Sequence, residues 1–352
     1  MPIFIFYILF YTMKKICLIF SLFFLFSCQN EYVEFHENKK IQQEIQQKLN
    51  DFSFDKIEYL SWLTLHNTPD ITFLDTLVSK IDASEEKVYL EVYIFTEKRL
   101  RKAIIDAHKR WVDVKVILEK NVYKAPSLNT QAFKDLQKAW VSVVYSNSQN
   151  YALNHTKMMI VDDEVILSTG NYSYSTFRYN REFFLILENK ILQKVFLDIF
   201  SADFVWDKKN IEHPNLILSP FSSREKLQYL LKNAQKSIKI YAHNFSDTEV
   251  IDILFQKQKE NIDIKMIFPD LKKVSSNEDE IWKLRKEKIP LVLVWKPEIH
   301  AKSILIDDKY LYIGSVNFSS YSIDKNREIG LLINNQDIIS KFLDIFQDDF
   351  QQ

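Results

Sequence analysis

Glycine is scarce in this chain of 352 residues, which has only three, and two of them (Gly170 and Gly314) lie in a motif that occurs twice. The two cysteines are Cys17 and Cys28, so the chain beyond them has no disulfide. The formal net charge is -1 and no run of five basic residues occurs, so no overall field draws the chain to nucleic acid or to an acidic membrane. No cysteine, histidine or carboxylate cluster has the spacing of a metal site, and we expect no metal and no other cofactor.

The first 28 residues predict a targeting segment. Lys14 and Lys15 precede an apolar run over residues 16–26, and a serine stands before Cys28. This order resembles a bacterial lipoprotein signal, which implies lipidation of Cys28 as the mature N-terminus. An uncleaved membrane anchor is the alternative. Either interpretation predicts an exported protein anchored to a membrane on the outer face of the cell envelope. Residues 29–70 are then a tether and N-terminal extension, of which the pattern leaves 51–70 unassigned.

Helical and extended patterns alternate in two successive rounds after residue 70. The hydrophobic content of 47% is enough to build a core. The chain length allows two domains or one domain of two halves, and we set these halves at 71–207 and 208–352. The alternation predicts an α/β sandwich with a largely parallel sheet. The expected helices are 71–81, 99–111, 131–140, 223–234, 249–259 and 278–288, and the expected strands are 88–95, 112–118, 141–145, 238–245, 262–268 and 291–295.

One motif appears in both halves with almost the same residues and spacing. The offset between copies is 145 residues at the histidines and 146 at the asparagines, so the first copy is one residue shorter in a turn. Duplication followed by divergence explains this agreement. The first copy comprises His155, Lys157, Asp162, Thr169, Asn171 and Glu182, and the second comprises His300, Lys302, Asp307, Ser315, Asn317 and Glu328.

The chemistry of the repeated residues suits a phosphoryl group. Positions i and i+2 of a strand share a face, so each histidine is expected beside its lysine. Lysine and asparagine side chains can bind the non-bridging oxygens, on which negative charge develops in the transition state. One imidazole can attack phosphorus while the other protonates the leaving oxygen. Glu182 and Glu328 recur at the same offset and are candidates to hold the far ring nitrogen of each imidazole.

The doubled pattern His-x-Lys-x4-Asp followed by Gly-Ser-x-Asn resembles the phospholipase D superfamily of phosphodiesterases. The second copy fits the pattern throughout, whereas the first has Ser168 where glycine is usual. The resemblance implies an internally duplicated α-β-α sandwich whose two halves pack with the active site at their interface. It also implies a metal-independent reaction through a phosphohistidine, with His155 as nucleophile and His300 as general acid and base. The resemblance also implies catalytic roles for Lys157, Lys302, Asn171, Asn317, Glu182 and Glu328. It implies substrate binding by Thr169 and Ser315, and a structural role for Asp162 and Asp307.

Several substrates remain open at this point. Hydrolysis of a phospholipid head group to phosphatidic acid fits a membrane tether, and the same superfamily includes nucleases that cut DNA or RNA. Transfer to a second alcohol, as in cardiolipin synthesis, is a further option. A non-catalytic lipoprotein that binds phosphate esters is the alternative from another class. Since both motifs lie on one chain, we expect a monomer.

A few other residues allow two interpretations. Cationic residues follow each motif and could either steer a phosphodiester or form ion pairs. His243 could line the site or pack at the edge of the core. The cations are Arg178, Arg181, Lys325 and Arg327.

Overall fold

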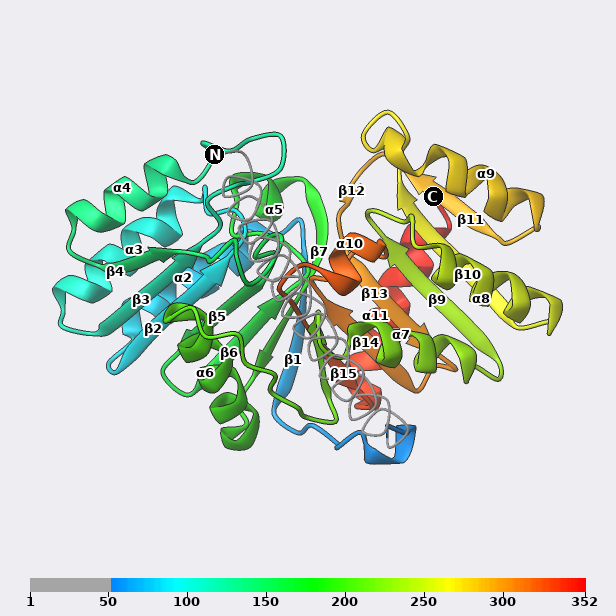
Figure 1. The fold of residues 1–352 in the computed structure, drawn as a ribbon, viewed down its shortest axis with the longest axis horizontal. Coiled ribbons are helices and arrows are strands. Elements are labelled where there is room, and N and C mark those ends of the chain that lie inside the picture. Colours follow the sequence, from blue (N-terminus) through cyan, green and yellow to red (C-terminus); the bar gives the residue numbers. More distant parts are fainter. Residues whose placement is uncertain (1–51) are drawn as a thin grey trace, which may run out of the picture. The chain divides into compact units, whose positions relative to one another are not determined.

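Two sheets with the same strand order organise residues 52–352, the part of the chain that the computed structural model describes (Figure 1). The first sheet has the order β1-β7-β6-β5-β2-β3-β4, and the second, read from the opposite edge, has β8-β15-β14-β13-β9-β10-β11. This agreement confirms the internally duplicated α/β fold. The strands of the first sheet are β1 (Leu63–Thr68), β2 (Lys87–Val92), β3 (Asp113–Leu118), β4 (Ser142–Tyr145), β5 (Lys157–Val161), β6 (Glu164–Ser168) and β7 (Asn180–Leu187). Those of the second are β8 (Leu216–Ser219), β9 (Ser237–Ala242), β10 (Asp263–Pro269), β11 (Leu291–Val294), β13 (Lys302–Ile306), β14 (Tyr310–Gly314) and β15 (Glu328–Ile333).

The prediction of a largely parallel sheet is wrong. The parallel pairs are β2–β3 and β3–β4 of the first sheet, β9–β10 and β10–β11 of the second, and the pair that β7 forms with the two-residue strand β12 (Glu298–Ile299). The other pairs within each sheet are antiparallel. Only two residues join β5 to β6, and a connection this short forces an antiparallel hairpin.

The segment that the sequence pattern leaves unassigned contributes to the first sheet. A 3-10 helix (Phe54–Lys56) precedes β1, and β1 pairs with β7 from Leu63↔Leu187 to Thr68↔Glu182. The short strand β8 pairs with β15 in the corresponding position of the second sheet, so the duplication includes this edge strand. The predicted signal, Cys28 and the polar part of the tether lie outside the described residues.

Helices flank the sheets, and equivalent helices begin with equivalent caps. Asn189 and Asn335, 146 residues apart, each accept two backbone N–H groups at the start of α6 and α11. Every helix among residues 52–352 is too short or too polar to span a lipid bilayer. The helices are α2 (Ile71–Ala83), α3 (Lys98–Lys109), α4 (Thr130–Lys138), α5 (Tyr174–Arg178), α6 (Lys190–Phe204), α7 (Ser223–Lys232), α8 (Thr248–Lys259), α9 (Glu278–Lys286), α10 (Ser320–Asp324) and α11 (Gln336–Phe350).

The two halves share one hydrophobic core. Residues from α6, α11 and both sheets belong to the same buried cluster, for example Phe196, Phe342, Ile160 and Leu305. A second cluster joins α2, α3 and α4 to the other face of the first sheet. Because tightly packed interiors resist deformation, the shared core fixes the position of β5 relative to β13. These two central strands carry the repeated motif.

Asp162 and Asp307 occupy equivalent turns after β5 and β13. Both have positive φ values, 47° and 55°, in the left-handed region that aspartate tolerates better than most residues. The Asp162 carboxylate accepts three backbone N–H groups from Glu85, Glu86 and Lys87, at 3.0, 2.9 and 2.9 Å. Asp307 accepts the N–H groups of residues 235–237 in the same way. Each aspartate therefore joins its hairpin turn to the start of the neighbouring strand.

We expect Asp162→Ala to destabilise the fold by about 1–2 kcal/mol, because three N–H groups lose a charged acceptor although water can partly replace it. Turnover of the folded variant should stay close to that of the wild type, since the turn lies at the opposite end of β5 from His155. Urea unfolding and kcat, measured on the same sample, check both points. A variant of unchanged stability that has lost activity would contradict the structural role of Asp162.

Candidate active site

The two histidines stand immediately before the central strands rather than on them. His155 precedes β5, His300 precedes β13, and Lys157 and Lys302 are the first residues of those strands. The His155 N–H donates to the Arg327 carbonyl (2.8 Å), and the His300 N–H donates to the Arg181 carbonyl (3.2 Å). The backbone of each half therefore positions the histidine of the other half.

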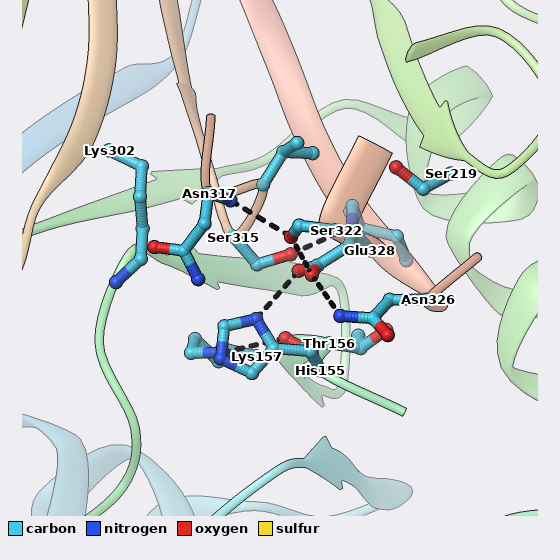
Figure 2. Close-up of polar contacts among 12 residues, drawn as sticks. His155, Thr156, Lys157, Ser219, Lys302, Ser315, Asn317, Ser322, Asn326 and Glu328 are labelled. Atoms are coloured by element: carbon cyan, nitrogen blue, oxygen red, sulfur yellow. Dashed lines mark hydrogen bonds and ion pairs between the residues drawn. The ribbon is translucent and has the colours of Figure 1, made fainter. Parts of the chain in front are cut away.

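Each imidazole is paired with a carboxylate of the opposite half. His155 Nδ1 lies 2.8 Å from Glu328 Oε2, as Figure 2 shows, and His300 Nδ1 lies 2.6 Å from Glu182 Oε1. An ionised carboxylate only accepts hydrogen bonds, so Nδ1 carries the proton. Nε2 of a neutral His155 then keeps a free lone pair, whereas Nε2 of His300 lies 3.4 Å from Lys302 Nζ. The sequence predicts these two glutamates, but not that the pairs cross between the halves.

Both carboxylates are completely buried and hydrogen-bonded. Glu182 accepts from Thr169 Oγ1 (2.8 Å) and Asn180 Nδ2 (3.4 Å). Gly170 permits this packing, since a Cβ there would lie 2.5 Å from Glu182 Cδ. Glu328 accepts from Asn326 Nδ2 (3.1 Å) and from the Ser322 hydroxyl. These bonds hold each carboxylate in the orientation that its histidine requires.

The other predicted residues surround the two rings. Lys157 Nζ donates to the His155 carbonyl (2.6 Å), and Lys302 Nζ lies 3.0 Å from His300 Nδ1. In Figure 2 the side chain of Asn317 points toward the His155 ring. Asn171 Oδ1 and Asn317 Oδ1 are buried and have no hydrogen-bond partner among residues 52–352. The two amides therefore keep hydrogen-bonding capacity within the site.

Thr169 and Ser315 lie behind the carboxylates, fully buried. Their hydroxyl oxygens accept the N–H groups of Phe183 (2.9 Å) and Ile329 (3.0 Å). These contacts orient the strands that carry Glu182 and Glu328, and the assignment of the hydroxyls to substrate binding stays a prediction. Ser168, which departs from the family pattern, also has a local role, since its hydroxyl accepts the Gly170 N–H at 2.8 Å.

Burial and neighbouring ammonium groups lower the basicity of the site. Burial is the largest influence on His155 and lowers its pKa to about 4, against the opposing effect of Glu328. Burial likewise lowers the pKa of Lys302 to about 8 and holds the pKa of His300 below its usual value. Burial alone would raise the pKa of Glu182, but the facing His300 imidazole and Lys302 bring it below the ordinary value. The free site therefore has neutral imidazoles and ionised carboxylates at neutral pH.

These shifts predict that kcat/KM is greatest on the acid side of pH 6.5. With the roles that the resemblance implies, His155 must be neutral, which holds above about pH 4, and His300 must be protonated. As the pH rises through the lowered pKa of His300, its proton is lost and kcat/KM falls. A further fall is expected above about pH 8, where Lys302 becomes neutral. Profiles of kcat/KM on a diester from pH 4 to pH 9 check this, and a maximum above pH 7 would contradict it.

Different rings pack against the two histidines. The Tyr93 ring contacts His155 edge-on with centroids 4.6 Å apart, whereas the His243 ring lies 4.3 Å from His300. His243 Nδ1 lies 3.2 Å from the Ile299 carbonyl. Of the two interpretations of His243, the structure supports a position in direct contact with the site.

Two of the arginines for which the sequence allowed either substrate steering or ion pairing form ion pairs between the halves. Arg181 Nε lies 2.6 Å from Asp349 Oδ2, and Arg327 Nε lies 2.7 Å from Asp203 Oδ2. Glu91 is buried with the second pair, and burial together with the Asp203 carboxylate raises the pKa of Glu91 well above its usual range. The sequence reasoning missed both aspartates, although Asp203 and Asp349 stand 146 residues apart, as Arg181 and Arg327 do.

A cavity of about 860 Å³ opens beside His300 and Asn171. Its wall includes residues of α5, the start of β7 and the loop before β12 (Glu298–Ile299), a two-residue strand of the second half that pairs with β7. The cavity reaches one of the two histidines directly. It offers room for one arm of a phosphodiester next to His300.

A protein-family model described as "Cardiolipin synthase, PLD-like domain" matches residues 77–204 and 227–350, and each match contains one copy of the motif. A phospholipase D from Rickettsia felis is 26% identical over 131 residues, which is 37% of this chain and 63% of the relative. The major cardiolipin synthase of Bacillus subtilis is 24% identical over 319 residues, covering 78% of this chain and 66% of that protein. The mitochondrial cardiolipin hydrolase of Xenopus laevis is 28% identical over 140 residues, covering 40% of this chain and 63% of that protein.

The matched segments thus span less than two thirds of the phospholipase D and cardiolipin hydrolase relatives. Among solved structures, the phosphatidylserine synthase of Haemophilus influenzae superposes with a TM-score of 0.70 at 13% identity. That match covers 88% of this chain and 90% of the synthase chain. At this identity the likeness describes the fold, and it agrees with a two-half architecture along nearly the whole described chain.

Proposed function

Because this chain belongs to the phospholipase D superfamily, we propose that it hydrolyses a phospholipid phosphodiester, releasing the head-group alcohol and leaving phosphatidic acid. One observation carries the proposal. Two imidazoles, each with its Nδ1 proton held by a buried carboxylate of the opposite half, stand beside two lysines whose positive charges act on both rings. Such a pair can supply a nucleophile and an acid to one phosphorus.

In the first step, His155 Nε2 attacks phosphorus and the bond to the head-group oxygen breaks. Protonated His300 gives its proton to that oxygen, so the head group leaves as a neutral alcohol group. Glu328 and Glu182 stabilise the positive charge that each ring carries when it is phosphorylated or protonated. Lysine and asparagine side chains bind the two non-bridging oxygens. These are Lys157, Lys302, Asn171 and Asn317.

In the second step, neutral His300 takes a proton from water and the resulting oxygen attacks phosphorus. The bond to His155 breaks, phosphatidic acid leaves, and His300 is protonated again for the next turnover. The cavity beside His300 supports this assignment of roles, because the leaving alcohol must depart on the side of the general acid. Another alcohol in place of water would give transfer rather than hydrolysis.

The relatives support a lipid substrate, since they include a phospholipase D and a cardiolipin hydrolase. A nuclease is the second candidate, because cations and aromatic rings, among them Lys273, Lys296 and Trp295, line the cavity. A phosphate-ester-binding protein without turnover is the remaining alternative. For the protein in its cell we propose a lipid on Cys28, export, attachment to the outer face of the envelope and action as a monomer.

The experiment uses the full chain in detergent micelles with EDTA present. Phosphatidylcholine, cardiolipin and single-stranded DNA are tested in parallel, and products are identified by mass spectrometry, with His155→Ala and His300→Ala as blanks. The proposal expects phosphatidic acid from lipid, activity unaffected by EDTA, and none in the blanks. Cleavage of DNA alone would replace the proposal with a nuclease. Binding of lipid without any turnover would replace it with the non-catalytic alternative.

A further inference from the structure

The cavity beside His300 has a cationic rim. Two exposed lysines flank it, Lys273 on the loop after β10 and Lys296 on the loop after β11, and the ring of Trp295 lies 4.9 Å from Lys273 Nζ. Trp295 itself is 47% exposed. Glu298 is the one carboxylate among the residues that line this cavity. The rim therefore presents more positive than negative charge to a ligand.

Not all of these charges are available. Arg178 Nη1 lies 2.7 Å from Glu97 Oε2, and Arg181 is paired with Asp349, so carboxylates behind the wall neutralise both arginines. Lys273 Nζ lies 3.3 Å from Glu298 Oε2, and both side chains are partly exposed. Lys296 forms no ion pair within residues 52–352. Because the Lys273–Glu298 pair is exposed to solvent and therefore weak, Lys273 and Lys296 are the cations of the rim that a substrate can engage.

The same positions in the other half carry different charges. At the offsets of the repeat, Tyr151 corresponds to Lys296 and Asp324 corresponds to Arg178. Tyr151 is buried and Asp324 is paired with Arg224. At one position the second motif carries the cation instead, since Lys325 corresponds to Tyr179. Lys325 Nζ lies 5.3 Å from the centre of the Tyr321 ring. The halves share the groups that would bind the reacting phosphoryl group and differ in what surrounds it.

We propose that Lys273 and Lys296 form a subsite for an anionic group on the leaving alcohol, an inference that rests on the proposed function. The favoured substrate is then a phospholipid whose head group carries a second phosphate. The leaving alcohol lies on the side of His300, where the cations are, and the uncharged diacylglycerol arm lies on the side where the buried Tyr151 stands in place of Lys296. A nucleic acid strand would instead bring phosphates to both sides of the scissile bond.

The test compares cardiolipin, whose leaving alcohol bears a phosphate, with phosphatidylglycerol, whose leaving alcohol is uncharged glycerol. The double variant Lys273→Gln/Lys296→Gln is assayed as full chain in mixed micelles, with Lys272→Gln as matched control. Lys272 is exposed and adjacent to Lys273 but does not line the cavity. For two exposed ion pairs we expect kcat/KM on cardiolipin to fall roughly 10-fold. On phosphatidylglycerol it should change less than about twofold, and the control should match the wild type on both.

The outcomes separate this subsite from the proposed function. If the wild type cleaves both lipids and the double variant keeps its kcat/KM, or loses it equally on both lipids, the subsite is overturned. The phospholipase function then remains intact. A wild type that cleaves neither lipid overturns both. Cleavage of single-stranded DNA that depends on the two lysines would assign the subsite to a nucleic acid and overturn the lipid. Thermal unfolding of the double variant should match the wild type, since both side chains are exposed.

Discussion

Replacing His155 by alanine is expected to lower turnover by at least about 10⁴-fold, because in the proposed mechanism His155 forms the bond to phosphorus. His300→Ala should cost roughly 10²–10⁴-fold, the usual contribution of a positioned acid or base. Since the two rings act in one reaction, the double variant should be hardly worse than His155→Ala. Steady-state assays on whichever phospholipid the wild type cleaves measure these ratios.

The control is His108→Ala, on α3, which should keep full activity. A leaving group that needs no proton separates the two roles further. On a p-nitrophenyl phosphodiester, His300→Ala should still release a first equivalent of p-nitrophenol, whereas His155→Ala should release none. The two-histidine mechanism is wrong if either single variant retains wild-type turnover on the lipid.

The next largest effect is expected from Glu328→Gln and Glu182→Gln. An amide keeps the size of the carboxylate but loses its charge, so it no longer stabilises the imidazolium or fixes the Nδ1 proton. The comparable change at a buried carboxylate–histidine pair suggests a loss of roughly 10²–10⁴-fold in kcat. Because the pairs cross, Glu328→Gln should impair His155, and Glu182→Gln should impair His300.

The p-nitrophenyl diester distinguishes crossed from uncrossed pairs. Glu182→Gln should retain a fast first release of p-nitrophenol, as His300→Ala does, and Glu328→Gln should slow that release. Glu249→Gln, at an exposed glutamate on α8, serves as the matched control. The reverse pattern, with Glu182→Gln slowing the first release, would contradict the crossed arrangement.

The repeat explains why so much of this architecture follows from the sequence. A period of 145–146 residues places the two motifs in equivalent positions, the strands before them recur at offsets of 149–150 residues, and the structure brings both motifs to one seam. The period cannot say which glutamate meets which histidine, because Glu182 stands at the same offset from His155 as Glu328 from His300, within one residue. Only the packing of the two sheets around the shared core decides that the pairs cross.

Other features depend on long-range contacts that a local pattern does not contain. The segment Leu63–Thr68 becomes a strand because the edge of β7 accepts it, although the apolar/polar alternation in its sequence is limited to its first four residues. The parallel sheet was wrongly expected because alternating helices and strands dominate the first part of each half, while the hairpins that follow determine the remaining pairings. Arg327 and Asp203 pair across 124 residues, so their ion pair appears only once the halves are packed.

The most direct measurement is mass spectrometry of the enzyme trapped during turnover. His300→Ala, which should form the intermediate but hydrolyse it slowly, is mixed with the p-nitrophenyl diester, quenched and digested. The mechanism predicts an added phosphoryl fragment on the peptide that contains His155, and none when His155→Ala is also present. An adduct on another residue, or no adduct while the wild type turns the substrate over, would contradict a phosphohistidine at His155.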